Sequence, residues 1–120
     1  MSPEEIKKPN PSLGMVIQEQ ARRYKDATGN EVSEEEVQRL LENFRGNLES
    51  GIGDLGGIKK AAKVFGTMRY YLYMLRDGSS PMAAMDIELA QRIAKGLGKN
   101  LGEMFTDPGS EECKHFTLDV

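Results

Sequence analysis

Residues 61–78 read AAKVFGTMRYYLYMLRDG, which places one glycine between two apolar-rich segments and another glycine after them. From Ile58 to Phe65 the apolar residues recur at i, i+3, i+4 and i+7, which is the spacing of one helix face. Gly66 permits a sharp turn, and a second helical segment follows from about Thr67 to Arg76. The stretch therefore predicts two short helices joined at a glycine.

The two faces of the second segment differ in chemistry. Arg69, Tyr73 and Arg76 share a polar stripe at i, i+4 and i+7, about 100° from the apolar residues. The small Ala62 lets the two helices cross closely, while the apolar stripe anchors the second helix. That inward stripe is predicted to comprise Met68, Leu72 and Leu75. This is the arrangement of a helix-turn-helix unit, predicted over about residues 58–76, with one face left free.

The unit resembles the Cro and lambda-repressor-like (XRE-type) helix-turn-helix family. The resemblance extends through residues 93–105, IAKGLGKNLGEMF, which look like the family's fourth and fifth helices, and it covers about Val37 to Phe105. It implies an all-α, lambda-repressor-like bundle with an extra N-terminal helix and a short C-terminal tail. It also implies a transcriptional regulator, expected to be a repressor, that binds double-stranded operator DNA as a homodimer.

Carried over by position, the resemblance assigns DNA-binding roles to seven residues. Those at the base edges of the major groove are Arg69, Tyr70 and Tyr73, and those near the phosphates are Lys59, Lys60, Lys63 and Arg76. Arginine can pair bidentately with guanine, and tyrosine rings can contact thymine methyl groups. For Tyr70 and Tyr73, a packing or protein-interface role is an equal alternative, and Tyr71 is expected to pack in the core.

Three apolar residues depart from the family pattern: Ile58, Met68 and Met74 stand where polar groups that contact DNA are common. Each departure removes an expected DNA contact. They motivate a second hypothesis, in which the same fold serves as a protein-interaction module such as an adaptor, an antitoxin or a phage-encoded inhibitor of a host protein.

The flanking sequence predicts further helices. Ser12 is expected to cap a helix that closes at Gly29, and Ser33 with Glu36 forms a capping box before a second helix. The glycine-rich residues 50–57 are expected to form a connector, because a glycine inside a helix costs about 1 kcal/mol relative to alanine. Asp86 is expected to cap a later helix, and residues 100–103 repeat the capping-box pattern. About six or seven helices result.

The ends of the chain are expected to lie outside the helical domain of residues 12–105. Residues 1–11 hold three prolines and predict an N-terminal arm with little packing. In the tail of residues 106–120, the alternation of Phe116, Leu118 and Val120 is typical of a strand. This tail could dock on a partner subunit or pack on its own chain, and the sequence favours neither.

Composition fits one soluble domain: 120 residues, 38% hydrophobic, with 16 Lys and Arg against 19 Asp and Glu. No apolar run approaches the ~20 residues of a membrane span, so a cytoplasmic protein without membrane association is expected. The net charge of −3 conceals a basic module, because residues 58–105 contain 8 basic and 4 acidic residues. Residues 58–76 contain five basic residues and no acid. The overall acidity therefore does not exclude a nucleic-acid partner.

No catalytic, metal or cofactor site is predicted. Cys113 and His115 cannot fill a tetrahedral zinc site alone, and two residues in a polar tail are poorly preorganised as a nucleophile and base. With a single cysteine, no intramolecular disulfide can form. The glycines of residues 51–57 lack the Gly-Lys-Ser/Thr ending of a phosphate-binding loop. The sequence thus favours a binding protein over an enzyme.

Overall fold

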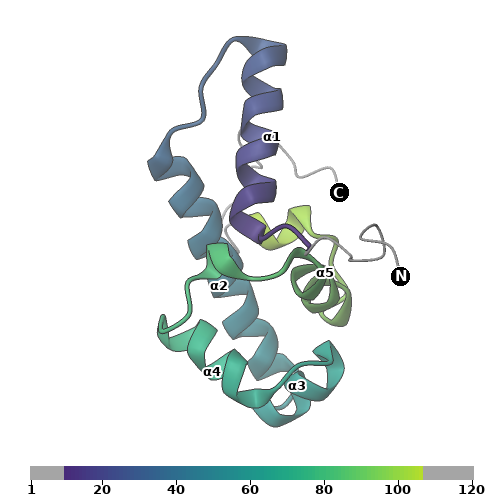
Figure 1. Cartoon of the computed structure of the whole chain (residues 1–120). Coiled ribbons are helices and arrows are strands. Elements are labelled where there is room, and N and C mark those ends of the chain that lie inside the picture. The colour runs from purple at the N-terminus through teal and green to yellow at the C-terminus, as the bar shows by residue number, and fades with distance from the viewer. Residues whose placement is uncertain (1–9, 107–120) are drawn as a thin grey trace, which may run out of the picture.

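The computed structural model describes residues 10–106 and is all-α over that range, as the helical spacing predicts. Five α-helices are joined by short loops, and two 3-10 helices flank the last of them (Figure 1). In chain order the elements are α1 (Leu13–Thr28), α2 (Glu34–Asp54), α3 (Ile58–Phe65), α4 (Arg69–Asp77), η2 (Met82–Ala84), α5 (Ile87–Gly96) and η3 (Gly102–Phe105).

The long helix α2 packs against more of the other elements than any other helix does. α3, α4 and η3 pack against it, and α3 also contacts both α4 and α5. α1 contacts η2 and α5 through its first turns, so its far end and the start of α2 extend away from the α3–α4 end of the molecule (Figure 1). The arrangement leaves α3 and α4 at one tip of the protein.

One apolar core joins all these elements. Its largest fully buried side chains are Phe44, Phe65, Leu13, Ile17, Leu48, Leu72, Leu75, Met85, Ile93 and Met104. The rings of Phe44 and Phe105 meet at a centroid distance of 5.5 Å, which ties η3 to α2. Burial of these faces stabilises the short helices, which are too short to be stable alone.

The predicted helix caps are confirmed. The hydroxyls of Ser12 and Ser33 accept hydrogen bonds from the third backbone N–H that follows each. The Asp86 carboxylate accepts from the backbone of α5 at 2.7 Å. Asn100 and Glu103 cap each other reciprocally at 2.9 and 3.0 Å, directly before η3. Local sequence chemistry therefore sets where these elements begin.

The expectation that residues 50–57 form a connector is wrong for its first part, because α2 continues to Asp54. Ile52 is buried in the core, and Gly51 lies directly against the side chain of Leu97, leaving no room for a Cβ. Tertiary packing at this close approach outweighs the low helix propensity of glycine. The connector shrinks to residues 55–57, where Gly56 and Gly57 adopt φ values of +94° and +118°.

Asn47 of α2 is the one buried polar residue among residues 10–106, and it connects η3 and Thr106 to α2. Its Nδ2, which has two hydrogens, is shared among the carbonyls of Asn43 at 3.0 Å, Met104 at 3.0 Å and Thr106 at 2.9 Å. Its Oδ1 accepts from Lys99 Nζ at 3.1 Å. This side chain therefore satisfies carbonyls that the short 3-10 helix η3 leaves without an internal donor.

Of the arm predicted over residues 1–11, only Asn10 and Pro11 lie within the described residues, and both contact the start of α5. Asn10 Nδ2 donates to Glu88 Oε2 at 2.9 Å, and the Pro11 carbonyl accepts from the Ile87 N–H at 3.0 Å. The rest of the arm and residues 107–120, including the predicted strand-like alternation, lie outside the described residues.

Candidate nucleic-acid interface

The turn between α3 and α4 depends on Gly66. Its φ of +69° lies in the left-handed region that residues with a Cβ rarely adopt. The Thr67 N–H donates to the Ala62 carbonyl at 3.0 Å, closing α3 with a capped end. Arg92 of α5 donates from Nη1 to the Gly66 carbonyl at 3.3 Å, so α5 braces the turn.

Leu72 and Leu75 anchor α4, since their side chains are fully buried. Met68 was placed in the same inward stripe, and that expectation is wrong, because its side chain is 69% exposed. Met68 is the N-cap residue with an extended backbone, at φ −86° and ψ 142°. The helical periodicity that places residues on one face therefore does not apply to it.

The outward face of α4 carries the predicted base-contacting residues. Arg69, Tyr70 and Tyr73 are all exposed. Tyr71 is half-buried and packs on the core, as expected. Arg76 is half-buried, and its guanidinium lies over the Tyr73 ring, 5.2 Å from the ring centroid. This cation–π contact favours that arrangement of the two side chains at the outer edge of the face.

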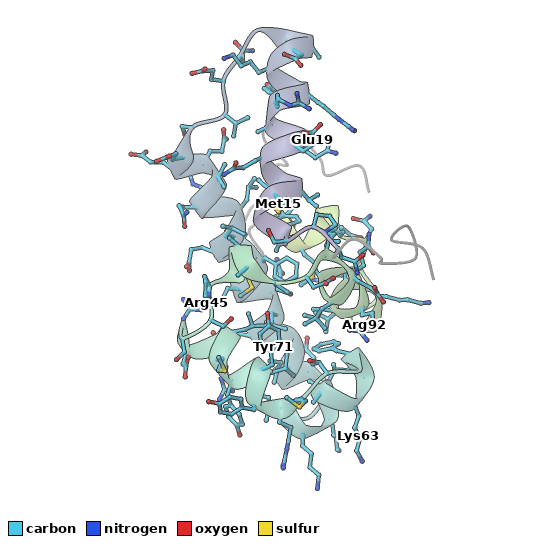
Figure 2. The ribbon with its side chains drawn as sticks, in the orientation of Figure 1. Met15, Glu19, Arg45, Lys63, Tyr71 and Arg92 are labelled. Carbon is cyan, nitrogen blue, oxygen red and sulfur yellow. The ribbon has the colours of Figure 1, made fainter. Side chains whose placement is uncertain are left out.

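The predicted phosphate-contacting lysines of α3 are also exposed: Lys59, Lys60 and Lys63. Figure 2 shows Lys63 extending from the α3–α4 tip. Within residues 10–106, no ion pair involves any of the three lysines or Arg69. The four ion pairs of this range lie on α1, on α2 and in the loop between them. The structure thus brings four uncompensated cations together at the tip.

Sequence reasoning did not identify Arg45, which connects α2 to the last turn of α4. Its Nε and Nη2 donate to the Arg76 carbonyl at 3.2 and 2.9 Å, and its Nη1 lies 3.6 Å from Glu42 Oε1. A cation at a helix C-terminus can donate to a carbonyl that has no partner within the helix. It also interacts favourably with the negative end of the helix dipole. The two residues are 31 positions apart, and no local pattern signals the contact.

Asp77 ends α4 with an acidic group next to the basic face. Hydrogen bonds from the Ser79 hydroxyl and backbone N–H lower the pKa of its carboxyl below the ordinary value, and the nearby Arg45 and Arg76 add to the effect. The Ser79 N–H lies 2.7 Å from Asp77 Oδ1. This carboxylate therefore closes a local turn directly after α4, about two turns from Arg69.

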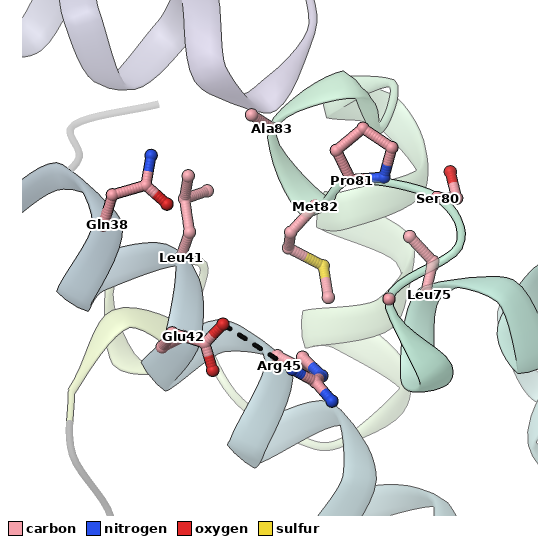
Figure 3. A pocket seen from close by; sticks show the side chains of 10 residues that line it. Gln38, Leu41, Glu42, Arg45, Leu75, Ser80, Pro81, Met82 and Ala83 are labelled. Atoms are coloured by element: carbon pink, nitrogen blue, oxygen red, sulfur yellow. Dashed lines mark ion pairs between the residues drawn. The ribbon is translucent and has the colours of Figure 1, made fainter.

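A hollow of about 230 Å³ lies beside Arg45, between α2 and residues 75–83 (Figure 3). It is smaller than ordinary small-molecule sites, which begin at about 300 Å³. No group of three or more His, Cys, Asp or Glu side chains within residues 10–106 is arranged to hold a metal ion. Cys113 and His115 lie outside that range. The strongest candidate site is therefore the α3–α4 tip.

Comparison of the chain with models of protein families, with curated proteins and with solved structures gives no match. Over residues 10–106 the chain forms a small all-helical domain, and these comparisons assign it to no family. None of the helices between residues 10 and 106 is long and apolar enough to cross a membrane.

Proposed function

We propose that this protein is a small sequence-specific DNA-binding regulator, similar to the Cro and lambda-repressor-like family. In this proposal α2, α3, α4, α5 and η3 correspond to the five helices of that family. α4 enters the major groove and α3 lies across the phosphates. Repression by a homodimer on a pseudo-palindromic operator is the expected mode of action.

The charge distribution at the tip is the observation that carries this proposal. On α1, by contrast, basic side chains have acidic partners: Arg22 and Arg23 pair with Glu19 at 2.6 and 3.4 Å. On α3 the spacing of Lys59 and Lys63 instead creates a like-charge i, i+4 pair, which costs about 0.2–0.5 kcal/mol. A polyanion that binds across these lysines would relieve the repulsion and release counterions.

The support around α4 also fits this role. Leu72 and Leu75 hold its inner face, Arg45 holds its last turn, and Arg92 holds the turn before it. Sites positioned by packed helices are more precise than sites on loops. A braced helix that presents Arg69 can therefore discriminate between base pairs without first becoming ordered.

A protein-interaction module is the second candidate, favoured by the exposed apolar side chains of the same tip. Tyrosine and methionine are enriched at protein interfaces, and the side chains of Tyr70 and Met68 are each 69% exposed. A stoichiometric protein partner that is lost on substitution of Tyr70, together with absence of DNA selection, would favour this alternative.

Selection from a pool of random duplexes, followed by gel mobility shift, tests the DNA-binding proposal. We expect the full chain to enrich a common sequence and to bind it at least 10³-fold more tightly than unrelated DNA, the usual lower range for specific binding. Arg69→Ala should reduce this ratio, because arginine is the main side chain on α4 that can pair bidentately with a base.

Arg23→Ala provides a matched control, since it removes the same charge from an exposed helix position on α1, outside α3 and α4. It should leave the specificity ratio unchanged. Failure to enrich any sequence at moderate salt, or equal effects of the two substitutions, would contradict the proposal.

A further inference from the structure

The α3–α4 tip combines its cations with an unusual amount of exposed apolar surface. Four large apolar side chains are exposed within ten residues: Val64 at 50%, Met68 at 69%, Tyr70 at 69% and Tyr73 at 46%. In the rest of residues 10–106 only Met15 on α1 is comparable, at 63%. Exposed apolar side chains gathered at one place mark a contact surface.

Compared with these apolar side chains, α4 presents few polar side chains that could hydrogen-bond to base edges. Its outward face has no Asn or Gln, the side chains that pair bidentately with adenine. Arg69 is exposed and without an ion pair in residues 10–106, whereas Arg76 lies over the Tyr73 ring. Asp77 could accept from cytosine, but its carboxylate is occupied by Ser79 at the far end of the helix. One free guanidinium therefore stands among apolar groups.

The major groove of DNA offers one apolar group, the C5-methyl of thymine. Given that the proposed function is correct, we propose that α4 recognises its half-site chiefly through thymine methyl groups that flank a guanine. Met68, Tyr70 and Tyr73 contact the methyl groups, and Arg69 pairs with the guanine. The lysines of α3 meet the adjacent phosphates, which makes a duplex the occupant that fits both the apolar and the cationic parts of the tip.

The size of the face limits how many bases it can read. From Met68 to Tyr73 the chain advances about 7.5 Å along the helix axis, at 1.5 Å per residue. Base pairs are stacked about 3.4 Å apart, so this length covers two to three of them. Each protomer is therefore expected to specify a short element of two or three base pairs, such as a guanine with one or two neighbouring thymines.

Replacement of thymine by deoxyuridine tests the inference, because it removes only the methyl group and keeps the hydrogen-bonding pattern. The probe is the duplex recovered by selection, measured by fluorescence anisotropy with the full chain. Each contacted methyl is expected to contribute about fourfold in affinity, the value for burying one such carbon. Deoxyuridine placed outside the short element should change affinity little and controls for altered duplex flexibility.

Protein variants then assign the contacts. Met68→Ala should bind the thymine duplex more weakly and lose most of its sensitivity to deoxyuridine at one position, and Tyr70→Ala should do so at another. Met15→Ala, at a comparably exposed methionine on α1, should keep the full sensitivity. All three positions are exposed, so thermal unfolding by circular dichroism should confirm that each variant folds.

Two negative outcomes have different meanings. A selected site that lacks thymine, or that tolerates deoxyuridine at every position, would overturn thymine-methyl recognition and leave DNA binding intact. Enrichment of no sequence at all would overturn the proposed function and this inference together, and a protein partner sensitive to Met68→Ala would then account for the apolar surface.

Discussion

Replacement of Asn47 by alanine should lower the free energy of unfolding by more than the loss of so small a side chain suggests. The side chain is 3% exposed, and its amide donates to the carbonyls of Met104 and Thr106 at 3.0 and 2.9 Å. In Asn47→Ala both carbonyls lose this donor. At ~0.5–1.5 kcal/mol for each bond, plus part of the cost of leaving buried carbonyls short of a donor, the free energy of unfolding should fall by about 2–3 kcal/mol.

Asn47→Asp separates hydrogen bonding from side-chain volume, because it keeps the shape while replacing the NH2 donor with a carboxylate oxygen. The introduced carboxylate would face carbonyl oxygens, which raises its pKa in the folded state, and Lys99 would reduce that rise without removing it. Since the folded-state pKa then exceeds the unfolded value, the destabilisation is complete above the folded-state pKa. It is relieved as the pH falls towards the unfolded value.

Urea unfolding followed by circular dichroism at 222 nm measures both effects, provided that the m-value is unchanged. Asn30→Ala is the matched control, because Asn30 is exposed in the loop between α1 and α2. It should change stability by less than about 0.5 kcal/mol. If Asn47→Ala were equally mild, or if the loss of stability caused by Asn47→Asp relative to the unsubstituted chain were no smaller at pH 5 than at pH 8, the reasoning about buried carbonyls would be refuted.

Three further predictions concern the helices around the tip. Gly96→Ala should cost about 1–3 kcal/mol in urea unfolding, because its Cβ would lie 2.8 Å from Phe65 Cδ1; an unchanged midpoint would refute the close packing of α5 on α3. Arg45→Met should lower stability by about 1–2 kcal/mol through loss of its bonds to the last turn of α4, and faster amide exchange there would locate the effect. The Asp77 carboxyl should titrate below its ordinary value in carbon-detected NMR, and Ser79→Ala should raise its pKa. The stability from that contact is present above the unfolded-state value and is lost as the pH falls through the folded-state pKa, and no change on substitution would contradict the contact.

Local patterns predicted most of the fold. The caps at Ser12, Ser33 and Asp86 and the turn at Gly66 were identifiable because each depends on side chains or glycines within three residues of the helix end. The end of α2 was not, because Gly51 packs against Leu97, a residue 46 positions later in the chain. Sequence spacing does not report such a close approach.

The exposed residues of the candidate site were predictable from the sequence, whereas the contacts that hold α4 in place were not. Helical spacing placed Arg69 and Tyr73 on an outward face, and the structure exposes both. Met68 does not lie on the predicted stripe, because it is the N-cap residue of α4 and its backbone is extended rather than helical. Arg45 and Arg92 hold α4 and its turn through carbonyls 31 and 26 positions away, contacts that depend on the assembled fold. Direct contact with DNA stays a prediction.

Amide chemical-shift mapping of the isotope-labelled chain with the selected duplex tests most directly whether the α3–α4 tip binds DNA. The expected result is that the largest changes fall within residues 58–77 and that α1 between residues 18 and 28 changes little. A duplex that bound while the largest changes lay on α1 or the first turns of α2 would contradict the assignment of the tip. A spectrum unaltered by any duplex would contradict DNA binding itself.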